Sequence, residues 1–117
     1  MNSRLAATAY ATAASHRSQR EQEADVFRRA NAALRVARDK GGMVARVRAL
    51  ADNDRLWLTV IGLVRDPANA LPAGLRASLV SVGLAVQREM QSDQPDFEFL
   101  LAVNENIARG LSGQVGA

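Results

Sequence analysis

Apolar residues recur every three or four positions along most of this chain, which is the spacing of an amphipathic helix, and strand-like alternation is absent. The first helical segment, within residues 1–14, is short and rich in alanine, so we expect it to be loosely ordered unless it packs. Residues 1–117 are therefore predicted to form an all-α fold, a single small helical bundle of about five to six helices. The predicted helices lie at about 3–14, 19–39, 43–51, 55–66, 72–91 and 96–110.

The breaks between these segments carry start and stop signals. Ser18 stands three residues before Glu21, which is the spacing of a capping box, at the end of the polar segment 15–18. Lys-Gly-Gly at 40–42 predicts a helix end with a glycine that accepts positive φ. Asp-Asn-Asp at 52–54 offers capping side chains to the next helix. Each signal predicts a helix boundary.

A turn with two prolines separates two strongly apolar helices. Asp66 precedes Pro67 and is therefore biased out of the helical region, and Pro72 suits the first position of the following helix. Residues 68–70 are predicted to make the turn between them. We expect the chain to reverse direction here.

Each helix is expected to bury one apolar stripe. Gly83 interrupts one of these stripes and costs up to about 1 kcal/mol relative to alanine, which a close helix approach would offset. The residues expected to point inward are Ala24, Phe27, Ala30, Leu34 and Ala37, then Val44, Val47 and Leu50, then Leu56, Trp57, Val60, Ile61 and Val64, then Leu75, Leu79, Val82, Val86 and Met90, and finally Phe97, Leu100, Leu101, Asn104, Ile107 and Leu111.

The composition narrows the function classes. The chain has 117 residues, of which 48% are hydrophobic and 4% aromatic, enough for one core built mainly from aliphatic side chains. It has no cysteine, which excludes disulfides and thiolate chemistry and suits a reducing compartment. The longest apolar stretch, 56–64, is too short to cross a bilayer, and the N-terminus lacks the apolar region of a secretory signal. A cytoplasmic location is expected.

The charge is unevenly distributed. Residues 1–50 hold ten basic and four acidic residues, a net +6, whereas residues 51–117 hold five and eight, a net −3. A basic half favours contact with nucleic acid, but here the basic residues alternate with acids and lack interleaved aromatic residues. RNA binding is therefore the alternative interpretation. Its candidate phosphate contacts are Arg28, Arg29, Arg35, Arg38, Arg46 and Arg48.

No pattern in the sequence indicates catalysis. The single histidine, His16, has no second histidine and no cysteine to form a metal site with it. Glu21, Glu23 and Asp25 fall in a predicted first helical turn, where acids stabilise the helix dipole. Phosphate-binding glycine loops, nucleophile motifs and metal-ligand spacings are absent. We expect no enzymatic activity, no cofactor and no metal.

Three residues have alternative roles. Trp57 is expected to pack in the core with its indole N–H bonded to a polar atom such as a turn carbonyl, although tryptophan is also enriched at partner hot spots. Asn104 lies in an apolar stripe and is expected to pin a helix end or the 66–72 turn, because an unpaired buried amide is costly. Arg76 either bridges to an acid such as Asp66 or recognises a partner.

The order of residues from 53 to 76 is more specific than any one of them. Asn-Asp-Arg-Leu-Trp at 53–57, followed by Asp-Pro-x-Asn-x-Leu-Pro-x-x-Leu-Arg-Ala at 66–77, resembles the FlaF family of alphaproteobacterial flagellar regulators. Ala-Tyr at 9–10 and the C-terminal run at 103–111 occur in the matching order. The residues that carry the motif are Asn53, Arg55, Leu56, Pro67, Asn69, Leu71, Pro72, Arg76 and Asn104.

The resemblance implies a role in flagellar filament production that is not enzymatic. It implies a protein that promotes flagellin synthesis or export in opposition to the regulator FlbT and engages flagellin as a secretion chaperone. The expected partners are therefore flagellin and FlbT. A helical end of flagellin would fit a helix-in-groove mode of binding. The candidate partner-binding residues are Leu58 and Leu63, on the second apolar side of their helix, together with Trp57, Leu5 and Tyr10.

Overall fold

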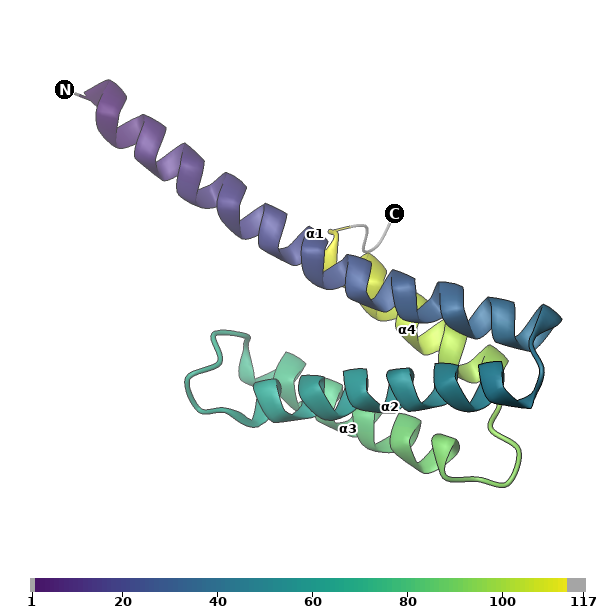
Figure 1. Ribbon diagram of the computed structural model, residues 1–117. Helices are drawn as coiled ribbons and strands as arrows, with labels where there is room; N and C mark the ends of the chain where they lie inside the picture. Colours follow the sequence, from purple (N-terminus) through teal and green to yellow (C-terminus); the bar gives the residue numbers. More distant parts are fainter. Residues whose placement is uncertain (1, 114–117) are drawn as a thin grey trace.

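Within residues 2–113 the protein is an all-α bundle of four helices, rather than the five to six predicted from the sequence (Figure 1). The computed structural model describes the backbone of residues 2–113 and the side chains of residues 6, 7 and 19–113. The helices are α1 (Asn2–Lys40), α2 (Met43–Arg65), α3 (Ala73–Met90) and α4 (Phe97–Leu111).

The helix α1 is continuous for 39 residues, so the predicted break at 15–18 and the capping box from Ser18 to Glu21 are wrong. The segment 15–18 contains neither glycine nor proline, and extending an existing helix is easier than starting a new one. The first half of α1 extends beyond the other helices, toward the N-terminus in Figure 1. The Cα atoms span 62 Å along the longest axis of the molecule because of this extension.

The helix α2 is also continuous, and it passes through the Asp-Asn-Asp segment at 52–54 that was predicted to start a new helix. The capping prediction is wrong because Asn53 lies in the core, fully buried, where its side chain has partners on other helices. Tertiary contacts therefore decide the role of a residue type that is otherwise typical of helix ends.

The start of α2 packs through alanines, not through valines. Val44 and Val47, predicted to point inward, are 71% and 61% exposed. Ala45 and Ala49 face the core in their place, and Ala49 is 4% exposed. Small side chains suit a close crossing of α1 and α2 directly after their connection.

Gly41 explains how closely these two helices approach. A Cβ atom added at Gly41 would lie 2.7 Å from the Ala37 Cα and 2.8 Å from the Ala45 Cβ. Among the glycines of residues 2–113 only Gly113 has positive φ, so the predicted positive φ at 40–42 is wrong. The glycine at position 41 is needed because there is no space for a side chain.

The helices pack mainly as two pairs, α1 with α4 and α2 with α3, and α1 also contacts α2. The contact between α3 and α4 is small. Gly83 brings α3 close to α2: an added Cβ would lie 2.7 Å from Ile61 Cγ1 and 3.2 Å from Trp57 Cε3. The predicted close helix approach at Gly83 is confirmed.

A buried asparagine network joins all four helices. The amide of Asn104 (α4) donates to Asn31 Oδ1 (α1, 3.0 Å) and to Asn53 Oδ1 (α2, 2.8 Å), and its oxygen accepts from Trp57 Nε1 (2.8 Å). The amide of Asn53 donates to the sulfur of Met90 in α3 (3.3 Å).

Every amide of this network has a partner. Asn31 donates to the Leu101 carbonyl at 3.0 Å, and Asn31, Asn53, Trp57 and Asn104 are fully buried. A buried polar network of this kind favours one helix register, because any shift would leave several polar groups unpaired.

Candidate functional site: an apolar groove at the open end of the bundle

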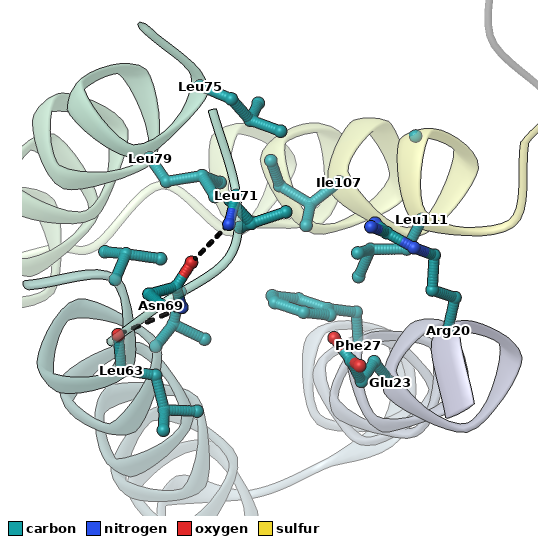
Figure 2. A pocket seen from close by; sticks show the side chains of 13 residues that line it. Arg20, Glu23, Phe27, Leu63, Asn69, Leu71, Leu75, Leu79, Ile107 and Leu111 are labelled. Atoms are coloured by element: carbon teal, nitrogen blue, oxygen red, sulfur yellow. Dashed lines mark hydrogen bonds between the residues drawn. The ribbon is translucent and has the colours of Figure 1, made fainter. Parts of the chain in front are cut away.

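The α2–α3 turn forms one side of a groove at the end of the bundle. The Asp66 carboxylate accepts from the Ala68 N–H at 2.9 Å. The Asn69 side chain donates to the Leu63 carbonyl (3.0 Å) and accepts from the Leu71 N–H (2.9 Å) (Figure 2). These bonds fix the turn between Pro67 and Pro72 and hold Leu71 over the groove. The predicted turn is confirmed.

The groove has a volume of about 300 Å³ and is bordered by all four helices and the turn. Figure 2 shows aliphatic side chains and the Phe27 ring surrounding the space. We call it the open-end groove. Its lining residues are Arg20, Glu23 and Phe27 of α1, Val60, Leu63 and Val64 of α2, Asn69 and Leu71 of the turn, Leu75 and Leu79 of α3, and Ile107, Gly110 and Leu111 of α4.

The groove offers apolar contact and few polar groups. Both polar groups of the Asn69 side chain are engaged within the chain, one with the Leu63 carbonyl of α2 and one with the Leu71 N–H, which leaves Arg20 and Glu23 as the other polar residues of the lining. Leu63 and Leu75 at its edge are 60% and 46% exposed. A site for a small polar molecule needs several converging polar groups, whereas apolar side chains of a partner need none. The arrangement therefore suits the apolar face of a helix.

The groove exists because the two helix pairs separate at this end. The small contact between α3 and α4 leaves Leu75 and Leu79 facing Ile107 across the opening (Figure 2). A second hollow, lined partly by Gln19 and Ala70, shares Arg20, Glu23, Asn69, Leu71 and Leu111 with the groove and adds a polar mouth to it.

The predicted partner-binding residues do not form one surface. Leu63 lines the open-end groove, whereas Leu58, 55% exposed, does not. Trp57 is fully buried against Phe27 and Asn104, so it lies in the core, with an asparagine and not a turn carbonyl as its acceptor. The side chains of Leu5 and Tyr10 lie outside the described residues.

The motif residues have mainly structural positions. Asn53 and Asn104 belong to the buried network, so the prediction that Asn104 pins a helix end or the 66–72 turn is wrong. Arg76 makes no ion pair with Asp66 among the described contacts, and its Nε is buried without a partner there. Arg55 is exposed, Leu56 is half-buried, and Pro72 is the N-cap of α3.

The sequence model of a known family, Flagellar protein FlaF, matches residues 6–111. The chain belongs to the FlaF family. The matched region of this FlaF chain ends at Leu111, the last residue of α4, and contains every residue that lines the open-end groove. No curated protein and no solved structure matches the chain.

The six arginines of the alternative RNA interpretation are not equivalent in this FlaF chain. Arg28 pairs with Asp25 (3.0 Å), and Arg38 pairs with Asp39 (2.8 Å) and with Glu98. The pKa of Asp39 is lowered by its hydrogen bond with Arg38, whose own pKa is raised. Arg46 donates to the Ala37 and Arg38 carbonyls at the end of α1, at 3.4 and 3.5 Å. Within the described residues, four of the six arginines have no ion pair: Arg29, Arg35, Arg46 and Arg48.

Other kinds of site have little support in the structure. Among the described residues, no helix is both long enough and apolar enough to serve as a transmembrane span. Within the same residues, no three His, Cys, Asp or Glu side chains come together as metal ligands.

Sequence reasoning missed both Asn31 and the groove. Ala30 was expected in the core stripe of α1, but Asn31 is the buried residue, and an asparagine in such a stripe is only recognisable once Asn104 is placed opposite. The groove combines residues far apart in sequence, so only the path of the chain brings Phe27, Leu71 and Ile107 together.

Proposed function

We propose that this chain binds flagellin and thereby promotes flagellin synthesis or export, and that the open-end groove receives the client. The family places the chain in flagellar biosynthesis. The observation that supports a binding role is the groove itself, an apolar hollow of about 300 Å³ whose edge residues Leu63 and Leu75 remain half-exposed. Large apolar hollows on a small protein are typical of partner sites.

The proposed mode of binding is one amphipathic helix of flagellin laid across the groove. Its apolar side chains enter between Phe27, Leu79 and Ile107, and its polar side stays in water. Burial of apolar surface supplies the affinity, at about 25 cal/mol for each Å² removed from water, before the costs of association. Binding thereby keeps the client helix from aggregating before export, which is the role of a chaperone. This role operates in the cytoplasm and opposes the action of FlbT on flagellin.

The direct test is isothermal titration of flagellin into this protein, with Leu63→Asp as the groove variant. The charge enters the groove and should weaken flagellin binding at least about tenfold, because a desolvated carboxylate is costly there. Leu58→Asp is the matched control: Leu58 has similar exposure on the same helix but lies outside the groove. The control should bind flagellin normally. Equal loss in both variants, or loss in neither, contradicts the groove assignment.

A second titration uses the flagellin leader RNA. Three of the six candidate arginines are held by intrachain partners, so the structure favours protein binding over RNA binding. Strong RNA binding that falls steeply between about 50 and 200 mM salt, without flagellin binding, would overturn the proposal.

A further inference from the structure

Another hollow lies on a different side of the bundle from the open-end groove. It lies between α1 and α2, has a volume of about 400 Å³ and is shallow. It is separate from the open-end groove and shares no residue with it. Its lining residues are Ala32, Ala33, Val36 and Ala37 of α1 and Ala45, Arg48, Ala49 and Asp52 of α2. We call this surface the α1/α2 face.

Positive charge surrounds this hollow. Arg48 lines it directly. Arg29 lies one turn before Ala33, Lys40 lies one turn after Val36, and Arg55 follows Asp52 by three residues, so helical spacing places these three on the same face. All four cations are exposed, and none belongs to an ion pair within the described residues.

One carboxylate, Asp52, lies among these four cations. The acids nearest in sequence to the cationic residues on α1 are otherwise engaged: Asp25 binds Arg28, and Asp39 binds Arg38. The face is therefore basic on balance, and its charge is available to a partner.

The face is also apolar at its centre. Val36 is 61% exposed at the wall of the hollow, and Val44, one turn before Arg48, is 71% exposed. Five alanines on the two helices allow another backbone to approach closely. A hollow with small side chains between two antiparallel helices matches the shape of a third helix laid along it.

We infer that the α1/α2 face binds an acidic amphipathic helix of a partner protein, at a site independent of the open-end groove. The apolar stripe of the partner helix covers Val36 and Val44, and the carboxylates of that helix pair with Arg29, Arg48 and the neighbouring cations. Charge complementarity decides the partner: a second copy of this basic face would be repelled.

Shape and composition decide against the other anionic partners. RNA would leave Val36 and Val44 beneath phosphates, and this face carries no aromatic side chain on which a base stacks. A membrane surface would bridge the hollow without filling it. A helix alone satisfies both the charge and the concave shape.

The test compares two helical peptides of three heptads, with identical leucine stripes flanked by glutamate in one and by lysine in the other. Fluorescence anisotropy should detect binding of the glutamate peptide and at least about tenfold weaker binding of the lysine peptide. The double variant Arg29→Glu with Arg48→Glu should reverse this preference. The matched control Arg65→Glu with Arg109→Glu makes the same change of net charge away from the face and should keep the original preference.

Three outcomes of the tests with peptides, RNA and vesicles overturn the inference. Equal binding of both peptides would indicate apolar attachment without charge recognition. An unchanged preference in the Arg29 and Arg48 variant would place the site elsewhere. Binding of polyuridylate or of phosphatidylglycerol vesicles through the same arginines, without binding of the glutamate peptide, would replace the helix by RNA or by a membrane.

Flagellin binding by the variant Arg29→Glu with Arg48→Glu distinguishes this inference from the proposed function. The charge-reversed variant should bind flagellin as the unchanged chain does, because neither arginine lines the open-end groove. Loss of flagellin binding in that variant would make the α1/α2 face part of the flagellin site and refute an independent site. Loss of flagellin binding in Leu63→Asp alone bears on the groove only.

Discussion

The middle of the bundle and its open end are built on opposite principles. In the middle, one residue, Asn104, is hydrogen-bonded to Asn31, Asn53 and Trp57, and the four side chains are fully buried. At the open end, apolar side chains such as Leu63 and Leu75 stay half-exposed around a groove. The first region fixes the positions of the helices, and the second leaves apolar surface uncovered.

The difference indicates how so small a protein can expose apolar surface and remain a defined bundle. Uncovered leucines alone would favour loose and shifting packing. A buried network whose polar groups are satisfied in one register penalises such shifts. Changes in the middle should therefore affect stability, and changes at the open end should affect binding.

Replacement of Asn104, in the middle of the bundle, should lower the free energy of unfolding more than any other change described below. Asn104→Leu leaves the Trp57 indole N–H and the side-chain oxygens of Asn31 and Asn53 unpaired in the core. Each unpaired buried group costs about 1–3 kcal/mol, so the free energy of unfolding should fall by about 4 kcal/mol. Urea unfolding followed by circular dichroism measures the change. Asn106→Leu, at an exposed position of α4, should change stability by less than about 0.5 kcal/mol. Similar losses in both variants would show that the network has no special role.

Replacement of either of two glycines by alanine should have a smaller effect on stability, and the two effects should have opposite signs. Gly83→Ala gains about 1 kcal/mol of helix propensity but places a Cβ 2.7 Å from Ile61 Cγ1, and overpacking of this kind costs about 1–3 kcal/mol. A net loss of about 1 kcal/mol is expected. Gly62→Ala meets no atom within 4 Å and should stabilise the protein by up to about 1 kcal/mol. Thermal unfolding compares the two, and stabilisation by both would mean that α2 and α3 approach less closely than the structure shows.

Substitutions in the turn beside the groove should change the free energy of unfolding less. Asn69→Ala removes the bonds to the Leu63 carbonyl and the Leu71 N–H, at an expected cost of about 1 kcal/mol because the turn is largely exposed. Asn69→Asp keeps an acceptor for Leu71 and should lose about half as much. In Asn69→Ala, the free energy of flagellin binding should weaken by more than the free energy of unfolding falls, because Leu71 is no longer held over the groove. Unchanged affinity would remove the turn from the binding site.

The exposed ion pair at the end of α1 should have the smallest effect. Arg38 lowers the pKa of the Asp39 carboxyl, so this pair stabilises the folded state above the usual carboxyl pKa of about 4 and loses its effect as pH falls through the lowered value. Arg38→Gln should raise the pKa of Asp39 toward its usual value, as measured by NMR titration of the side chain. An unchanged pKa would contradict the assigned cause. The change in unfolding free energy should be slight, because exposed pairs contribute little.

The sequence predicted the second half of the chain better than the first. The bounds of α3 and α4 lie within about one residue of the predictions, because Pro67, Pro72 and the 92–95 break are signals that act locally. The breaks predicted at 15–18 and 52–54 rested on polar residues, which helices tolerate when the helix is already formed or when, as for Asn53, a buried partner is present.

The candidate site was only partly accessible from sequence. The surplus apolar character of α2 was readable, and Leu63 does border a groove. The sequence did not reveal that Leu58 and Leu63 lie on different surfaces, because their surroundings depend on where α1 and α4 pack against α2. Nor did it show that valines would be exposed and alanines buried at the start of α2, since the close approach at Gly41 selects small residues there.

The Phe27 ring lines the open-end groove and also meets Trp57 edge to face, with ring centroids 5.6 Å apart. Because the chain contains a single tryptophan, all indole emission comes from this one buried position. An occupant that displaces Phe27 changes the surroundings of the emitter, so the protein carries a built-in optical reporter of its own groove and needs no attached dye.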